Sequence, residues 1–311
     1  MPGTGSHDQR VTILMAVRDG ARHLSAQLDS IAAQSLDGWR LLASDDGSTD
    51  ESRALIDRFA ATHPQGRVRL LAGPGQGPAA NFRHLLRAVP ENGDLVAFGD
   101  QDDVWLPDKL ERAARALAGL DGPAIWCSSV TICDKALRPL AVSTLPRRGP
   151  SFRHALVQNL VRGNTLVLNP AAFRLIAAAD AETGPVVMHD WWIYQLVTGA
   201  GGRVIFDPQP SVLYRQHGAN VVGGARGLRT RLAAAGRLVL GAHRGWSRRN
   251  LQALHPSRHR LTPENRRVLD DFARLQDPLP QRIAALRRGG FHRQGRLEQL
   301  ALWATVLLGR A

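Results

Sequence analysis

A chain of 311 residues with 44% hydrophobic and 22% charged residues has the composition of a globular protein with one large domain or two smaller ones. No apolar run approaches the roughly 18 residues that a membrane-spanning helix requires. The N-terminal segment MPGTGSHDQR lacks the apolar stretch of a secretion signal, so we expect a cytoplasmic protein. Cys127 and Cys133 are too few for a zinc site, and we expect them to be thiols in the core.

The net charge of +13 is located in the last part of the chain. Residues 223–311 contain 18 arginines and five acids, whereas residues 1–222 contain 22 basic and 22 acidic residues. The sequence therefore predicts a neutral body that carries a basic tail. Such a tail favours an anionic partner, which could be phospholipid head groups, a lipid-linked acceptor or nucleic acid.

Short apolar segments alternate with helix-like segments over about the first 120 residues. The expected strands are 11–15, 40–44, 68–71 and 95–99, and the expected helices are 24–33, 48–61 and 78–89. The second of these helices opens on a capping-box pattern, Ser48 followed by Glu51. This alternation predicts βαβ units around a parallel sheet.

The pattern is less regular beyond residue 120. Strand-like runs occur at 124–129, 165–168, 203–206 and 211–214, and a helix is expected to start near Asp190. From about residue 224, arginine-rich helices are broken by Gly and Pro, which predicts a body at 1–223 and a helical extension at 224–311. In the last helix, one face is expected to carry Leu297, Leu300, Ala301, Ala304 and Leu308.

Carboxylates are concentrated where two of the predicted strands end. Asp45 and Asp46 follow the second strand, and Asp100, Asp102 and Asp103 follow the fourth. Ligands of parallel sheets bind beyond the carboxyl ends of the strands. Like charges this close destabilise each other unless protons or a cation neutralise them. One such cluster could be a solvated turn, but two at neighbouring strand ends favour a Mg²⁺ site completed by substrate phosphate oxygens.

Several motifs together resemble family 2 glycosyltransferases of the GT-A fold, in particular bacterial rhamnosyltransferases of cell-surface polysaccharide synthesis. They are VTILMAVRDG, QLDSIAAQSLDGWRLLASDDGSTDES, FGDQDDVWLPDKL, MHDWW and LYRQHGANVVG. The resemblance covers about residues 9–223 and implies an α/β fold, a GT-A Rossmann-like mixed sheet flanked by helices, with a helical C-terminal extension. It therefore defines 1–223 as the GT-A catalytic domain and 224–311 as the arginine-rich extension.

The resemblance also implies roles for residues on the donor side. The donor-binding residues would be Ala16, Arg18, Asp45, Asp46, Asp100 and Gln101. Asp45 and Asp46 would contact the base and ribose of a nucleotide-sugar, while Asp102 would be the direct ligand of Mg²⁺ or Mn²⁺. His217, in YRQH, would bind the metal or diphosphate, although a lone His before Gly is often structural. Many relatives have Thr-Tyr-Asn at residues 17–19, and here Arg18 could stack on the base or reach phosphate instead.

On the acceptor side, the resemblance makes Asp190 of HDWW the catalytic base. The other residues implied there are Gly163, Asn164, His189 and Trp191. Two structural alternatives stay open at this point. Asp190 could simply cap the helix that follows it, and one of the adjacent tryptophans is expected to belong to the core.

The function implied is inverting, metal-dependent transfer of a sugar, with rhamnose as a candidate, to a cell-surface glycan or lipid-linked acceptor. The enzyme would be cytoplasmic, with peripheral association at the inner membrane face through the basic tail. Nucleotidyl transfer would also use acids at strand ends, but it usually needs a basic residue near an N-terminal glycine loop, and the lysines, Lys109 and Lys135, lie elsewhere. A further alternative is a nucleic-acid-binding protein whose tail contacts phosphates, although the tail contains few aromatic residues for base stacking.

Overall fold

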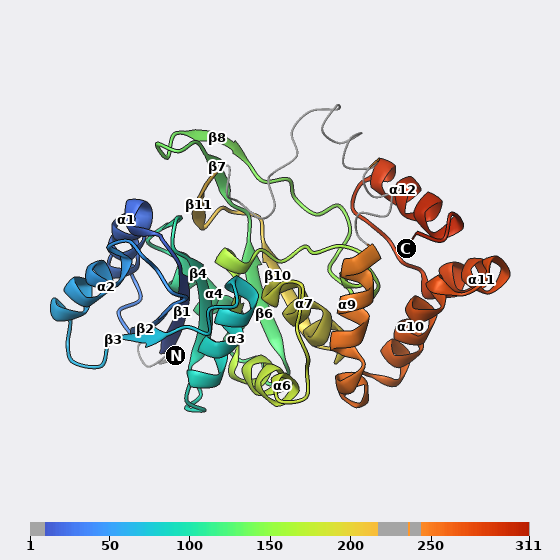
Figure 1. The fold of residues 1–311 in the computed structure, drawn as a ribbon, viewed down its shortest axis with the longest axis horizontal. Coiled ribbons are helices and arrows are strands. Elements are labelled where there is room, and N and C mark those ends of the chain that lie inside the picture. Colours follow the sequence, from blue (N-terminus) through green and yellow to red (C-terminus); the bar gives the residue numbers. More distant parts are fainter. Residues whose placement is uncertain (1–9, 217–235, 237–243, 311) are drawn as a thin grey trace, which may run out of the picture.

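A seven-stranded sheet forms the centre of the structure, a computed structural model that describes residues 10–216, 236 and 244–310 (Figure 1). The strand order is β10-β6-β9-β4-β1-β2-β3. The strands are β1 (Val11–Val17), β2 (Trp39–Asp45), β3 (Val68–Ala72), β4 (Leu95–Asp100), β6 (Ala124–Ser128), β9 (Val167–Leu168) and β10 (Arg203–Asp207). Only β9 runs antiparallel to its neighbours, so the sheet is mixed as expected.

Helices cover both faces of this sheet because its strands are apolar on both sides. In β1, Ile13 and Met15 belong to one buried cluster, whereas Leu14, which points to the opposite face, belongs to the other. The first cluster is completed by α1 (Ala21–Ala32), α2 (Ser52–Ala61) and α4 (Lys109–Leu117). The second is completed by α3 (Pro78–Ala88), α5 (Phe152–Ala155), α6 (Pro170–Asp180) and α7 (His189–Gly199).

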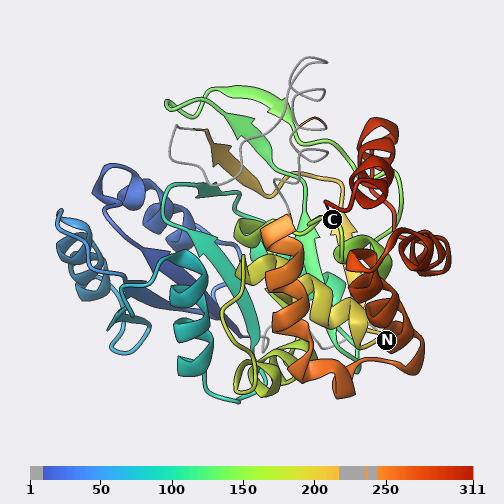
Figure 2. The same cartoon turned by 45° about the vertical axis from the view of Figure 1, so that its right-hand side comes forward.

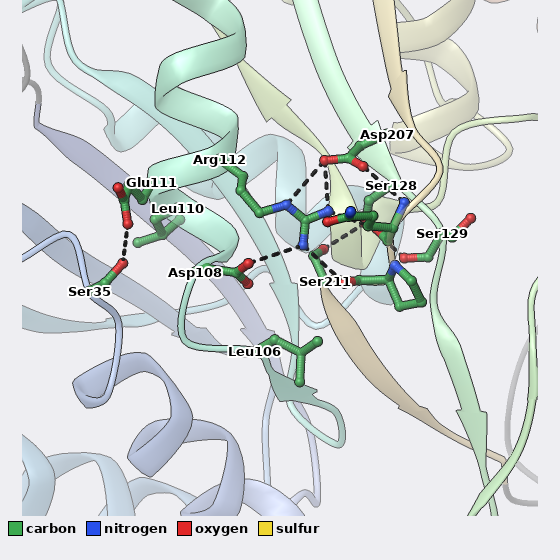
Figure 3. A network of polar contacts seen from close by, with 12 residues as sticks. Ser35, Leu106, Asp108, Leu110, Glu111, Arg112, Ser128, Ser129, Asp207 and Ser211 are labelled. Carbon is green, nitrogen blue, oxygen red and sulfur yellow. Dashed lines mark hydrogen bonds and ion pairs between the residues drawn. The ribbon is translucent and has the colours of Figure 1, made fainter.

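A second, four-stranded sheet lies beyond the carboxyl end of β6. Its strands, in spatial order, are β5 (Val104–Trp105), β11 (Val212–Arg215), β7 (Thr131–Cys133) and β8 (Pro139–Val142). Arg112 of α4 holds the turn that leads into β11 by donating to the carboxylate of Asp207 at 2.7 Å and to the carbonyl of Gln209 at 2.8 Å (Figure 3). The hydroxyls of Ser128 and Ser211 lie 2.6 Å apart beside it, so β11 is fixed to both α4 and β6.

The described part of the C-terminal extension packs against the sheet domain. It contains α9 (Arg244–Leu254), α10 (Pro263–Ala273), α11 (Leu279–Gly289) and α12 (Arg296–Leu307), with 3₁₀ turns at Pro256–Arg260 and Arg274–Gln276. Leu254 and Phe272 belong to the same buried cluster as Trp192 of α7. Arg153 of α5 donates to the carbonyl of Gly289 at 2.5 Å, which joins the two parts further. No described helix is long and apolar enough to cross a membrane.

The structure corrects two details of the sequence interpretation. The helix expected from Ser48 begins at Ser52, because the Ser48 hydroxyl accepts a hydrogen bond from the Asp19 backbone instead of capping its own helix. In α12 the predicted apolar face is divided. Ala301 is buried, but Leu300 and Leu308 are exposed, and the buried side of the helix consists of Ala301, Leu302, Thr305 and Val306. The two cysteines are buried free thiols, as predicted.

Candidate active site

The acidic motifs meet because β4, β1 and β2 end side by side. Ala16 is paired with Asp100 across β1 and β4, and Val17 is paired with Asp45 across β1 and β2. The carboxyl ends of all three strands therefore present their last residues at one edge of the sheet. This is the edge at which open α/β sheets bind their ligands.

The two acids after β2 have different partners. Asp45 is buried and accepts hydrogen bonds from the backbone N–H of Ser48 at 3.2 Å and from Arg53 Nη1 at 3.0 Å. Asp46 is also buried, and its two carboxylate oxygens accept from the backbone N–H groups of Gly75 and Gly77, each at 2.7 Å. The glycine-rich segment 73–77 thus surrounds Asp46, whose two oxygens are both engaged by the protein.

A second set of backbone contacts connects the ends of β1 and β4. The backbone N–H of Arg18 donates to the Gln101 side chain at 2.8 Å, and the Gln101 amide donates back to the Arg18 carbonyl at the same distance. The side chain of Arg18 is exposed, with Nε 4.0 Å from the carboxylate of Asp19. Gln101 therefore supports the loop after β1, and Arg18 extends from that loop toward solvent.

The carboxyl group of Asp100 is close enough to other carboxylates for their charges to shift its pKa. Burial raises its pKa to about 7, with the charges of Asp102 and Asp190 acting in the same direction and the Lys109 ammonium opposing them. Residues from β4, the turn after it and the start of α7 are therefore within electrostatic reach of one another. A bound cation would relieve this repulsion.

The chemistry of this donor set fits a hard divalent cation. Asp100 and Asp102 offer only carboxylate oxygens, the ligands that Mg²⁺ and Mn²⁺ accept. Among residues 10–216 and 244–310, no group of three or more His, Cys, Asp or Glu side chains could hold a metal ion without other ligands. Substrate phosphate oxygens would have to complete such a site. His217, the other predicted ligand, lies outside the described residues.

Asp103 is buried beside these carboxylates, and burial, with the charges of Asp100 and Asp102 acting in the same direction, raises its pKa. It is completely buried and accepts from the side chain of Asn164 at 2.5 Å and from the backbone N–H of Arg215 at 3.1 Å. The ammonium of Lys109, also completely buried, donates to the carbonyl of Asn164 at 2.7 Å and lies 3.2 Å from the centre of the Trp105 ring. Asp103 and Asn164 thus join the turn after β4 to β11 and to the 3₁₀ turn Gly163–Thr165.

Asp190 lies at the start of α7, where it is held by two backbone N–H groups. Gly163 donates to one carboxylate oxygen at 3.0 Å, and Trp191 donates to the other at 2.7 Å. Burial raises the pKa of Asp190 to about 6, although these hydrogen bonds and one from Asn159 lower it. The helix-capping alternative is wrong, because α7 begins at His189 with Met188 as its N-cap and Asp190 lies in its first turn. The charge of the Asp190 carboxylate raises the pKa of Asp100 at the end of β4.

His189 is packed beneath this site. Its ring stacks against Phe98 and lies 4.0 Å, centre to centre, from Phe82, and burial lowers its pKa to about 3. Its Nε2 has no hydrogen-bond partner within the part of the chain that the structure describes. A Cβ at Gly163 would lie 3.0 Å from this nitrogen, so glycine is what permits the close approach of the 163–165 turn.

Both tryptophans of HDWW are buried. Trp191 is 4% exposed, donates through Nε1 to the carbonyl of Ala155 at 2.6 Å and packs edge-on against Trp246 of α9. Trp192 belongs to the core cluster that reaches the C-terminal extension. In this structure the tryptophans fix α7, and so Asp190, to its surroundings.

Sequence reasoning missed the residues that hold the site together. Lys109 and Arg215 were not candidates, and neither was Arg83, a buried residue of α3 that ion-pairs with Asp180 and donates to the carbonyl of Thr183 at 2.8 Å. These contacts fix the segment that leads into Asp190. A buried arginine is rare unless it is paired, but its burial could not be read from the sequence.

Comparison with known proteins identifies the family. The model of the family described as "Glycosyl transferase family 2" matches residues 12–172, more than half of the chain. The chain is 27% identical over 223 residues to the dTDP-rhamnosyl transferase RfbG of Shigella flexneri, covering 67% of this chain and 73% of that protein. It is also 34% identical over 107 residues, a third of each chain, to the succinoglycan biosynthesis protein ExoW of Rhizobium meliloti.

Solved structures show the same fold. The mannosyltransferase of Pyrobaculum calidifontis in complex with GDP-Man and Mn²⁺ superimposes with a TM-score of 0.53 at 18% identity, covering 96% of this chain and 86% of that one. TarS 1-349 of S. aureus in complex with UDP-GlcNAc superimposes with a TM-score of 0.54 at 12% identity, covering 96% and 91%. These findings support a transferase over a nucleic-acid-binding protein. The chain belongs to glycosyl transferase family 2.

Proposed function

We propose that this glycosyltransferase is inverting and metal-dependent, and that it moves a sugar from a nucleotide-diphosphate donor to a cell-surface glycan or lipid-linked acceptor. The observation that carries the proposal is the position of Asp190. Its carboxylate is oriented by Gly163 and Trp191, it faces Asp100 at the end of β4, and burial raises its pKa to about 6. A base needs these three properties: orientation, proximity to the reacting groups and a pKa near neutrality.

The donor is proposed to bind across the ends of β1, β2 and β4. Asp45 and Ala16 would line the position of the base and ribose, and Arg18, in the loop after β1, would reach the base or a phosphate. Mg²⁺ or Mn²⁺ would be held by Asp102 with Asp100 beside it, and when bound it would stabilise the charge that develops on the leaving diphosphate. Asp46 would hold the 73–77 loop in place beside the donor site through its hydrogen bonds from Gly75 and Gly77, and would not contact the donor itself.

The acceptor hydroxyl is proposed to approach the Asp190 carboxylate beside the 163–165 turn, from the side of Asp100. Asp190 removes the proton from this hydroxyl as its oxygen attacks the anomeric carbon on the face opposite the diphosphate. The configuration inverts because this is a single displacement, and no covalent sugar–enzyme intermediate is needed. His189 and Trp191 keep α7 and its base in position.

The similarity to RfbG makes dTDP-rhamnose the first donor to test. The basic extension, with its 18 arginines in residues 223–311, is consistent with an acceptor carried on an anionic lipid and with a location on the cytoplasmic face of the membrane.

Calorimetric titration with UDP, dTDP, GDP and CDP, each with Mn²⁺ and with chelator, tests the donor site directly. Binding of one nucleotide that requires Mn²⁺ is expected, and dTDP would support a rhamnosyl donor. Equal binding with chelator would overturn the metal dependence. If no nucleotide binds even in the presence of candidate acceptors, the donor site is not where we place it.

A further inference from the structure

The large apolar side chains that the structure exposes are concentrated in two segments. Seven of the eight among the described residues are 49% to 64% exposed and form what we call the exposed apolar surface: Leu140, Val142, Leu145, Leu300, Trp303, Leu307 and Leu308. The eighth, Leu279 at the start of α11, is 47% exposed. Exposed apolar residues that cluster within one short segment, as they do on α12, often mark an interaction site.

Helix α12 contributes Leu300, Trp303 and Leu307 to this surface, and its C-cap residue, Leu308, also belongs to it. Leu300, Trp303 and Leu307 are spaced three and four residues apart, so they share one face, while the opposite face is buried against the protein. A helix that is apolar on all sides is ordinarily buried on all sides. Beyond its first turn, α12 therefore exposes Leu300, Trp303 and Leu307 to solvent, where polar residues are normally found.

The segment around β8 contributes the other members and is tied to α12. Gln294, two residues before α12 begins, accepts hydrogen bonds from the backbone N–H groups of Arg147 and Arg148 at 2.8 and 2.9 Å, and it donates to the Arg148 carbonyl at 3.0 Å. β8 and α12 lie on the same side of the molecule in both views, the side toward which β6 leads into β7 (Figures 1 and 2). This is also the side on which β1 and β4 end at the candidate active site.

The charges around the exposed apolar surface are basic. The exposed arginines that flank its two segments include Arg147, Arg148 and Arg296. The nearby acids are engaged within the protein: Asp134 pairs with Arg138, and Glu298 accepts from Gln158 at 3.0 Å. Exposed leucines and a tryptophan surrounded by arginines match the interface of an anionic bilayer, where Trp lies at the level of the head groups.

We propose that the exposed apolar surface docks the enzyme on an anionic lipid membrane, with Leu300, Trp303 and Leu307 entering the head-group region and the flanking arginines contacting lipid phosphates. This docking would turn the side that carries the candidate active site toward the bilayer, where a lipid-linked acceptor would be found. The orientation of the acceptor rests on the proposed function, whereas the binding to lipid does not.

Co-sedimentation of the full-length chain with large vesicles tests the surface without donor or acceptor. Partition into vesicles of equimolar phosphatidylglycerol and phosphatidylcholine is expected, with little into phosphatidylcholine alone and a decrease as salt is added. The double variant Leu300→Gln, Trp303→Gln should partition at least about tenfold more weakly. The control Leu279→Gln replaces a leucine of α11 that is 47% exposed and lies outside the surface, and it should partition like the wild type.

Thermal unfolding should show that both variants are folded, because the replaced side chains are exposed. Failure of the wild type to bind anionic vesicles, equal binding to both lipid compositions, or equal binding by the double variant would each overturn the proposal. If light scattering showed a dimer that the double variant loses, with no vesicle binding, the surface would be an interface between two copies instead. Nucleotide binding measured on the same samples keeps a failure here separate from a failure of the proposed function.

Discussion

The backbone N–H of Gly163 donates to the carboxylate of Asp190 at 3.0 Å, so the turn that precedes β9 orients the candidate base. Glycine suits this contact, because a Cβ at residue 163 would lie 3.0 Å from His189 Nε2 and would push against a ring that packs on Phe82 and Phe98. The 163–165 turn therefore contacts Asp190 through the Gly163 backbone and Asp103, in the turn after β4, through the Asn164 side chain.

Gly163→Ala should lower kcat about ten- to a hundredfold because the turn must move away from His189 and release Asp190. Affinity for the nucleotide should stay unchanged. Steady-state kinetics and nucleotide titration provide the two readouts. Gly122→Ala is the control, because its Cβ meets nothing within 4 Å, and it should behave like the wild type. A loss of kcat in both variants would contradict the role of Gly163.

The rate of transfer should depend on pH through Asp190. Burial raises the pKa of this carboxyl from 3.8 to about 6, so the ionised form that can accept a proton is lost as the pH falls below about 6. We expect kcat/KM to decrease about tenfold per pH unit there. The Asp190→Asn variant should keep a low rate without this decrease. A full decrease in that variant would assign it to another group, Asp100 being the first to test because its pKa is raised to about 7.

The roles of Asp102 and Asp190 should separate in paired variants. Asp102→Ala should abolish metal-dependent donor binding because it removes the proposed metal ligand. Asp190→Asn should keep donor binding and lose transfer, because the amide cannot take the proton. Calorimetry with the preferred nucleotide and Mn²⁺, followed by transfer assays, measures both effects. Equal loss of binding in the two variants would rule out this division.

Asp46 and Asp45 should also differ, although they are adjacent. Asp46→Ala removes the acceptor of the Gly75 and Gly77 N–H groups and should lower the free energy of unfolding by about 2 kcal/mol. Denaturant unfolding measures this loss. Asp45→Ala should mainly weaken nucleotide binding. The 73–77 loop should gain faster amide hydrogen exchange in the Asp46 variant alone, and unchanged exchange there would argue against its supporting role.

The two lysines form a natural pair for comparison. Lys109→Met should lower the free energy of unfolding by about 2 kcal/mol, because it leaves the buried carbonyl of Asn164 without its hydrogen-bond donor. Lys135→Met should have almost no effect, since that side chain is exposed. Denaturant unfolding of both variants at neutral pH is the measurement. Similar stability for the two proteins would mean that the buried ammonium contributes little.

The part of the site that lies at strand ends could be predicted from the sequence. Asp45 and Asp100 follow apolar runs long enough to be recognised as strands, and parallel strands bring their ends together. The sequence does not separate the role of Asp103 from those of Asp100 and Asp102, because β4 ends at Asp100 and a turn follows in which strand alternation no longer applies. Its contact with Asn164, 61 residues away, could not be predicted.

Contacts between distant residues explain what could not be predicted. Asp46 and Gly77 are 31 residues apart, and Arg83 and Asp180 are 97 apart, so no local pattern links them. Strands β5 and β9 contain two residues each, which is too short for alternation to be detected. The start of α2 was misplaced for the same reason, since the hydroxyl of Ser48 is engaged by Asp19 from the preceding loop.

The paired hydrogen bonds between Gln101 and Arg18 have a consequence for redesign of the enzyme. A Cβ at Gly20 would lie 2.3 Å from Gln101 Oε1, so the Gln101 side chain packs directly against residues 18–20. A loop transplanted from a relative to change the preferred nucleotide would displace Gln101 and, with it, the turn that carries Asp100 and Asp102. Loop and turn should therefore be exchanged together, as a single cassette.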